Sequence, residues 1–142
     1  MKKEKQEVLK QCNAMCKNTL METLEIEFVD FDDESLTARM PVTSKVHQPD
    51  GVLHGGASVA LAESVGSAGA FLFLNTENIA VRGIEISANH VKSVKEGFVE
   101  AQATIIHKGR TTQLWQIKIL NSEKELVSLV KLTTITIPTK KP

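Results

Sequence analysis

One carboxylate, Glu63, lies in the middle of the most apolar stretch of this 142-residue chain. It is the only acidic residue between Asp50 and Glu77. Burying an unpaired charge costs several kcal/mol or forces the group to protonate, so a side chain of this kind is more often functional than structural. A positioned carboxylate can serve as a general base. An ion pair between subunits is the alternative explanation.

A glycine pair, Gly55 and Gly56, precedes Glu63 by about two helical turns and follows a Pro-Asp-Gly turn at 49–51. The N–H groups that start a helix have no partner within it and lie at the positive end of its dipole. Donors of this kind can stabilise a developing oxyanion by about 3 kcal/mol each. Ser67, four residues after Glu63, falls on the same helical face. A glycine pair alone is usually just a turn.

The elements that must hold these residues can be read from the hydrophobic pattern. Residues 57–74 are apolar almost all round, which predicts a buried helix of about five turns. Period-two alternation predicts strands over 23–30, 35–42, 79–93, 98–107, 111–121 and 125–137, and short turns between the last four indicate antiparallel hairpins. An amphipathic helix is expected over 4–18 and a frayed tail over 139–142.

These elements form one α+β domain spanning residues 1–142, in which a curved antiparallel sheet wraps around the long helix. Because a single subunit would leave sheet edges free, we expect the chain to form oligomers.

Composition narrows the possible partners. Seventeen basic residues balance seventeen acidic ones, which gives no support for a nucleic acid or an anionic membrane surface as partner. The run 61–74 is interrupted by Glu63 and is too short for a bilayer span. The first residues are charged and lack a secretory core, so we expect a cytoplasmic protein. Cys12 and Cys16 are expected to be free thiols, and no metal site is expected.

Three segments resemble one known family. The first contains Gln48, the run Leu53-His54-Gly55-Gly56-Ala57, and Glu63 with Ser67; the second is Gly-Ile-Glu-Ile-Ser-Ala-Asn-His at 83–90; the third spans 107–115. Together they resemble the hotdog-fold acyl-CoA thioesterases of the PaaI-like group. The resemblance is greatest to the branch with 1,4-dihydroxy-2-naphthoyl-CoA hydrolase and the Arthrobacter-type 4-hydroxybenzoyl-CoA thioesterase.

The resemblance implies hydrolysis of an aromatic or medium-size acyl-CoA to the free acid and CoA, without a cofactor. It also implies a homodimer joined edge to edge as the minimum unit, with a homotetramer expected, and active sites at the dimer interface. Glu63 would be the nucleophile or general base, and the Gly55 N–H would polarise the thioester carbonyl. His54 and Gln48 would line the reacting end, and Ser67 would help place water or substrate.

The resemblance also places His90 and the turn Lys108-Gly109-Arg110-Thr111 near the CoA arm. Structural roles stay open for several of these site residues. His54 could be a capping or packing residue, His90 a structural or peripheral one, and Lys108 and Arg110 part of a solvated turn. Two other functions also stay open, a hotdog acyl-CoA dehydratase and a non-catalytic acyl-CoA-binding sensor. Both are less well supported, because the histidine–aspartate motif of the first and the DNA-binding domain of the second are not seen.

Overall fold

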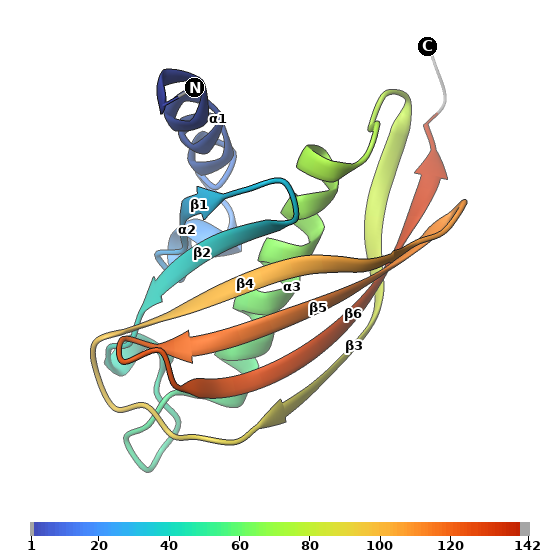
Figure 1. The fold of residues 1–142 in the computed structure, drawn as a ribbon. Coiled ribbons are helices and arrows are strands. Elements are labelled where there is room, and N and C mark those ends of the chain that lie inside the picture. The colour runs from blue at the N-terminus through green and yellow to red at the C-terminus, as the bar shows by residue number, and fades with distance from the viewer. Residues whose placement is uncertain (1, 140–142) are drawn as a thin grey trace.

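The computed structural model describes residues 2–139 and contains one sheet, one long helix and an N-terminal helical segment (Figure 1). The tail expected to fray lies, apart from Thr139, outside the described residues. The elements are α1 (Lys2–Ala14), α2 (Leu20–Thr23), β1 (Glu27–Phe31), β2 (Ser35–Pro41), a 3-10 turn η1 (Ser44–Val46), α3 (Gly55–Phe73), β3 (Ile79–His90), β4 (Phe98–Lys108), β5 (Thr112–Asn121) and β6 (Leu126–Pro138).

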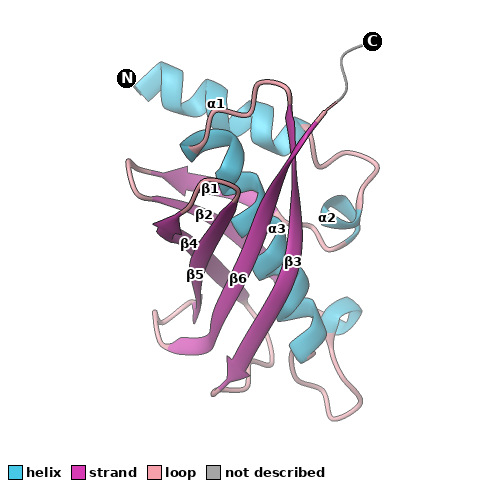
Figure 2. Ribbon diagram, turned by 90° about the vertical axis from the view of Figure 1, so that its right-hand side faces the viewer, coloured by secondary structure: helices cyan, strands magenta, loops and turns pink. Residues whose placement is uncertain are grey.

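The six strands form a single antiparallel sheet in the order β1-β2-β4-β5-β6-β3. The sheet curves around α3, which crosses one of its faces (Figures 1 and 2). This confirms the α+β architecture expected from the sequence. Strands β1 and β3 are the two edges, and β3 is twelve residues long with several exposed positions.

Small residues on α3 let it approach the sheet closely. A Cβ on Gly66 would lie 2.6 Å from the Leu132 side chain, and one on Gly69 would lie 2.8 Å from the Trp115 ring. Trp115 is fully buried and donates its indole N–H to Thr134 Oγ1 at 2.9 Å. Since an indole N–H needs an acceptor when it is buried, this bond fixes the ring against the helix.

The long helix spans Gly55–Phe73, within two residues of the predicted helix 57–74 at each end, and it is longer than the apolar run 61–74, which by itself is too short for a bilayer span. By length and composition it could cross a membrane, and it is the one such helix among residues 2–139. A core helix passes the same test, and α3 packs against the sheet as the core helix of this protein.

The N-terminal segment differs from the expected strand over 23–30. Thr19 accepts a hydrogen bond from the Met21 N–H at 3.2 Å and caps the short helix α2. Glu25 then takes a positive φ of 59° and ends it, so β1 begins only at Glu27. Local capping therefore overrides the apolar alternation that predicts a strand at residues 23–26.

A bulge interrupts the pairing of β3 with β6 between Gly83 and Glu85. It leaves Ile84 with 56% of its surface exposed, although strict alternation would put it on the same face of the strand as Ile86 and Ala88, which are partly buried against the core. The extra residue shifts the period-two pattern by one position, which sequence alternation alone does not show.

Candidate active site

The loop before α3 is held rigidly and delivers the start of the helix. Gly51 adopts φ +82° at the tip of the turn, a conformation that favours glycine. The Leu53 N–H donates to Val94 O and the His54 N–H donates to Val46 O, each at 2.8 Å. The position of residue 55 is therefore determined by backbone hydrogen bonds on both sides of the loop.

Three of the first four N–H groups of α3 have partners. His54 is the N-cap residue, and its Nδ1 accepts from the Gly56 N–H at 2.7 Å. The N–H groups of Ala57 and Ser58 donate to the His54 carbonyl. The Gly55 N–H donates to no other group among residues 2–139. One backbone donor at the positive end of the helix thus remains open to a ligand.

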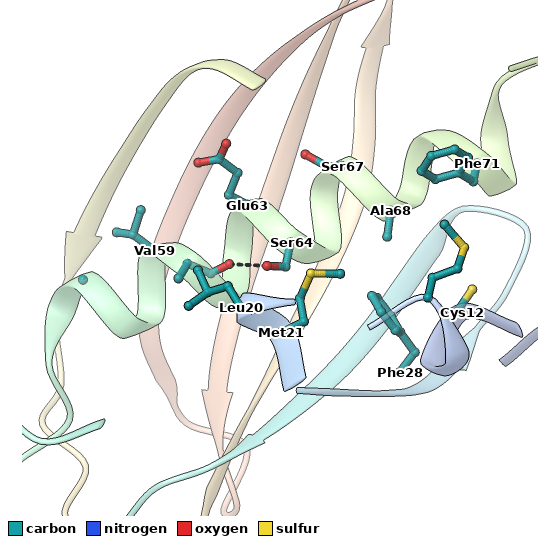
Figure 3. Close-up of a pocket in the computed structure, with 13 residues that line it drawn as sticks. Cys12, Leu20, Met21, Phe28, Val59, Glu63, Ser64, Ser67, Ala68 and Phe71 are labelled. Carbon is teal, nitrogen blue, oxygen red and sulfur yellow. Dashed lines mark hydrogen bonds between the residues drawn. The ribbon is translucent and has the colours of Figure 1, made fainter. Parts of the chain in front are cut away.

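Glu63 lies two turns further along α3 and is half-buried. It is not enclosed all round, because the side of α3 away from the sheet is only partly covered within one chain. Its carboxylate lies against Gly83 of β3, where a Cβ would be 2.7 Å from Oε2. Glu63 and Ser67 project from the same side of α3, one turn apart (Figure 3).

The partly covered side of α3 borders a mostly apolar pocket of about 580 Å³. The N-terminal segment forms its other wall, and Leu20 and Met21 of α2 approach α3 there (Figure 3). Glu63 and two hydroxyl groups are the polar side chains of this pocket. The lining consists of Cys12, Met15, Leu20, Met21, Phe28, Gly56, Val59, Ala60, Glu63, Ser64, Ser67, Ala68 and Phe71.

A second, more polar pocket of about 290 Å³ lies at the start of α3. Gln48, Gly55 and His90 line it together. Gln48 donates its amide to Asp50 Oδ1 at 2.9 Å, and His90 ends β3 beside Gly55. The predicted site residues therefore fall into two groups within one chain, with Glu63 and Ser67 at the first pocket and Gln48, Gly55 and His90 at the second.

The turn from Lys108 to Thr111 lies at the opposite end of α3 from Gly55. Lys108 Nζ donates to Phe73 O at 3.1 Å, at the C-terminal end of the helix, where a positive charge is favourable. The 19 residues of α3 place this end about 28 Å from Gly55. Within one chain the turn does not reach the other predicted site residues.

The two cysteines are free, and burial raises the pKa of both thiols. Cys12, although it lines the apolar pocket, is therefore a poor nucleophile. Within residues 2–139, no three His, Cys, Asp or Glu side chains gather in a way that could hold a metal ion.

A family model described as "Thioesterase superfamily" matches residues 50–128, more than half of the chain. The chain belongs to this superfamily. Within it, the 1,4-dihydroxy-2-naphthoyl-CoA hydrolase of Escherichia coli is 44% identical over 126 residues, covering 89% of this chain and 92% of that protein.

Two solved thioesterases have the same fold. A variant of thioesterase PA1618 from Pseudomonas aeruginosa superimposes with a TM-score of 0.89 at 45% identity, covering 92% of this chain and 94% of the other. Thioesterase SAV0944 from Staphylococcus aureus gives a TM-score of 0.80 at 41% identity, covering 84% and 98%. These likenesses confirm a hotdog thioesterase of the PaaI-like group, and the chain is a thioester hydrolase.

Two residues near this thioesterase site have no role assigned from the sequence. Gly83 makes room for the Glu63 carboxylate. The hydroxyl oxygen of the buried Ser128 lies 2.7 Å from His90 Nδ1, within hydrogen-bond distance. The sequence could have indicated the importance of Gly83, since a glycine inside a predicted strand often marks a bulge or a close approach of another group. Ser128 gives no such signal, because its contact depends on the pairing of β3 with β6.

Proposed function

We propose that this thioesterase hydrolyses an aromatic or medium-size acyl-CoA, with the Glu63 carboxylate and the Gly55 N–H acting on one thioester group. The observation that carries the proposal is the open Gly55 N–H at the start of the helix whose middle carries Glu63. An oxyanion donor and a carboxylate are what thioester hydrolysis requires.

The two groups serve one substrate only if two chains combine. Eight residues separate Gly55 from Glu63, which is about 12 Å along the helix axis. A reacting carbonyl group must lie within about 3 Å of both the nucleophile and the oxyanion donor. A carboxylate from one subunit and a helix start from its partner meet this requirement, so the proposed unit is a homodimer, with a homotetramer as the larger assembly.

The free edge of β3 supports this assembly. This edge strand is long and mostly exposed, and its backbone can pair with the same strand of a second copy. Pairing of this kind relates the two copies by a two-fold axis and gives two equivalent sites. It also offers a way for residues 108–111 of a chain to approach a substrate bound at another chain.

The solved relative from Staphylococcus aureus supports the choice of residues. One of its structures carries an alanine in place of a glutamine, and another carries an alanine in place of a glutamate fifteen positions further on. Gln48 and Glu63 are also fifteen positions apart. The same residue types at the same spacing support both as site residues here.

The acyl group is proposed to occupy the 580 Å³ pocket beside Glu63. Its lining of methionine, leucine, valine and phenylalanine favours an apolar group, and its volume suits a small ligand. The relative from Escherichia coli is named for an aromatic acyl-CoA, which is consistent with an aryl group in this pocket.

In the proposed reaction, the Gly55 N–H donates to the thioester oxygen as negative charge develops on it. Glu63 either attacks the carbonyl carbon, which expels the CoA thiolate and leaves a mixed anhydride that water then hydrolyses, or it removes a proton from a water that attacks the same carbon and expels the thiolate. Ser67 helps to place the water, while Gln48 and His54 line the reacting end. Single turnover in heavy-oxygen water tests attack by Glu63, since label in its carboxylate requires that water has opened an anhydride at the Glu63 carbon.

Thiol release from a panel of acyl-CoAs tests the function. Glu63→Gln is expected to keep the fold and lower kcat by about 10²- to 10⁴-fold. Tight binding of acyl-CoA without turnover by the unaltered protein would instead indicate a sensor. Loss of the fold or the oligomer in Glu63→Gln, with normal turnover by the folded remainder, would make Glu63 a structural ion-pair partner.

Subunit mixing tests the shared site. Gly55→Pro removes the N–H at the first helical position, where the proline backbone is tolerated because His54 before it is already extended with ψ 130°. The proline ring also displaces the His90 side chain of the same chain, so the variant disables the Gly55 end of the site as a whole. Refolding Gly55→Pro together with Glu63→Gln in equal amounts should restore about a quarter of the wild-type activity, because half of the dimers are mixed and each has one intact site. No recovery would place both groups in one chain.

A further inference from the structure

His90 lies where a side chain on residue 55 would be. A Cβ on Gly55 would be 2.8 Å from His90 Nε2, so the ring packs directly over the start of α3. Both residues line the 290 Å³ pocket. The ring nitrogen that faces Gly55 is Nε2, and the opposite nitrogen, Nδ1, lies 2.7 Å from Ser128 Oγ.

Ser128 is fully buried and lies opposite His90 in the pairing of β3 with β6. Among residues 2–139, His90 Nδ1 is the one partner of its hydroxyl group. If Nδ1 carried a hydrogen, the buried hydroxyl would have no acceptor for its own hydrogen, which is unfavourable. The Ser128 O–H therefore donates to Nδ1, and a neutral His90 carries its hydrogen on Nε2.

This tautomer places two N–H donors next to each other in one pocket, the Gly55 backbone N–H and the His90 Nε2–H. Two donors beside one acceptor position form an oxyanion hole. We propose that the His90 Nε2–H donates to the substrate carbonyl oxygen together with the Gly55 N–H, and that Ser128 is the positioning residue that sets its tautomer and ring orientation. This role rests on the proposed thioesterase site.

Paired substitutions test the role of His90. His90→Ala should lower kcat by about 10²-fold, the usual cost of one oxyanion donor, with a much smaller change in KM. His90→Gln should recover a large part of this loss, because its amide N–H can lie near the position of Nε2. His107→Gln, at the far end of β4, is the matched control and should leave kcat unchanged.

Ser128→Ala removes the hydroxyl from a buried position while keeping the strand. It should lower kcat by about tenfold, because the ring loses the bond that orients it. Nitrogen-15 spectra of the wild-type protein give a readout other than activity. With only four histidines in the chain, the signals of His90 can be assigned by their loss in His90→Gln. In the neutral form of the ring they should show a protonated Nε2 and an unprotonated Nδ1.

A hydrogen on Nδ1 in those spectra would overturn the proposal, as would a kcat of His90→Ala within about twofold of wild type. A His90→Gln variant no better than His90→Ala would reduce His90 to a packing role. If Glu63→Gln and Gly55→Pro abolish turnover while His90→Ala does not, only the role of His90 is wrong. If all three leave turnover unchanged, the proposed thioesterase site is wrong as well.

Discussion

The carboxylate of Glu63 in α3 occupies the space that a side chain on Gly83 in β3 would fill, with a separation of 2.7 Å between Oε2 and the position of a Cβ. Glu63 is the helix residue with the strongest case for catalysis, and Gly83 lies at a bulge of the edge strand β3. The position of the Glu63 carboxylate therefore depends on the absence of a side chain at residue 83. Any side chain at position 83 must displace the carboxylate.

Gly83→Ala is therefore expected to lower kcat with little loss of stability. The group that must shift is the far end of a flexible glutamate, so the change in unfolding free energy should be small. A displacement of about 1 Å at a catalytic group can cost about 10²-fold in rate. Steady-state kinetics and thermal unfolding measure the two effects.

Gly66→Ala is the contrasting variant, because its Cβ would press on Leu132 in the core at 2.6 Å. It should lower the unfolding temperature clearly, since overpacking a core costs about 1–3 kcal/mol. Normal turnover by Gly83→Ala would show that Glu63 is not held by this contact.

Met21→Trp should shift the acyl preference toward shorter groups. Met21 lines the apolar pocket from α2, and a larger ring there would fill part of its 580 Å³. Since each buried methylene contributes about 0.8 kcal/mol, long acyl groups that no longer fit should lose about tenfold or more in kcat/KM. Glu22→Gln, which does not line this pocket, is the control. An unchanged order of preference across an acyl-CoA series would place the acyl group elsewhere.

Arg110→Ala should raise KM several-fold with little change in kcat, if the turn meets a CoA phosphate. Phosphate binding is the same in the ground and transition states, so its loss affects KM alone. High salt should have the same effect on the wild-type enzyme. Lys118→Ala on the exposed face of β5 controls for a general loss of positive charge. A constant KM would leave Arg110 as a solvated residue.

Asp32→Ala should reduce stability near neutral pH and matter less in acid. The Asp32 carboxylate accepts from the N–H groups of Glu34 and Ser35, each at 2.8 Å, in the turn between β1 and β2. These bonds favour the ionised form and lower the pKa of Asp32.

A carboxyl group with a lowered pKa in the folded state stabilises the fold above its unfolded pKa, and this contribution is lost as the pH falls through the folded pKa. The difference in unfolding temperature between Asp32→Ala and wild type should therefore be constant from about pH 6 to 8 and shrink below about pH 4. A difference that grows in acid would contradict this assignment. Asp33→Ala is the neighbouring control.

Local patterns were sufficient for most of the secondary structure. Alternation predicts five of the six strands, 35–42, 79–93, 98–107, 111–121 and 125–137, to within three residues at each end, and the apolar run 57–74 predicts the core helix. These predictions hold because side-chain period and helix or strand geometry are linked within a few residues. The exceptions are residues 20–26, where Thr19 caps a helix, and the bulge at Gly83, where one extra residue reverses the faces.

The sequence by itself determined the fold class, the family and the candidate residues, because these depend on residue types and short spacings along one chain. Only the tertiary structure decided how those residues are distributed. It pairs Gly83 with Glu63 and Ser128 with His90, and it separates Gly55 from the turn at residues 108–111 by the length of α3. Contacts of this kind join segments far apart in the chain, so they follow from sheet pairing and helix packing rather than from any local pattern.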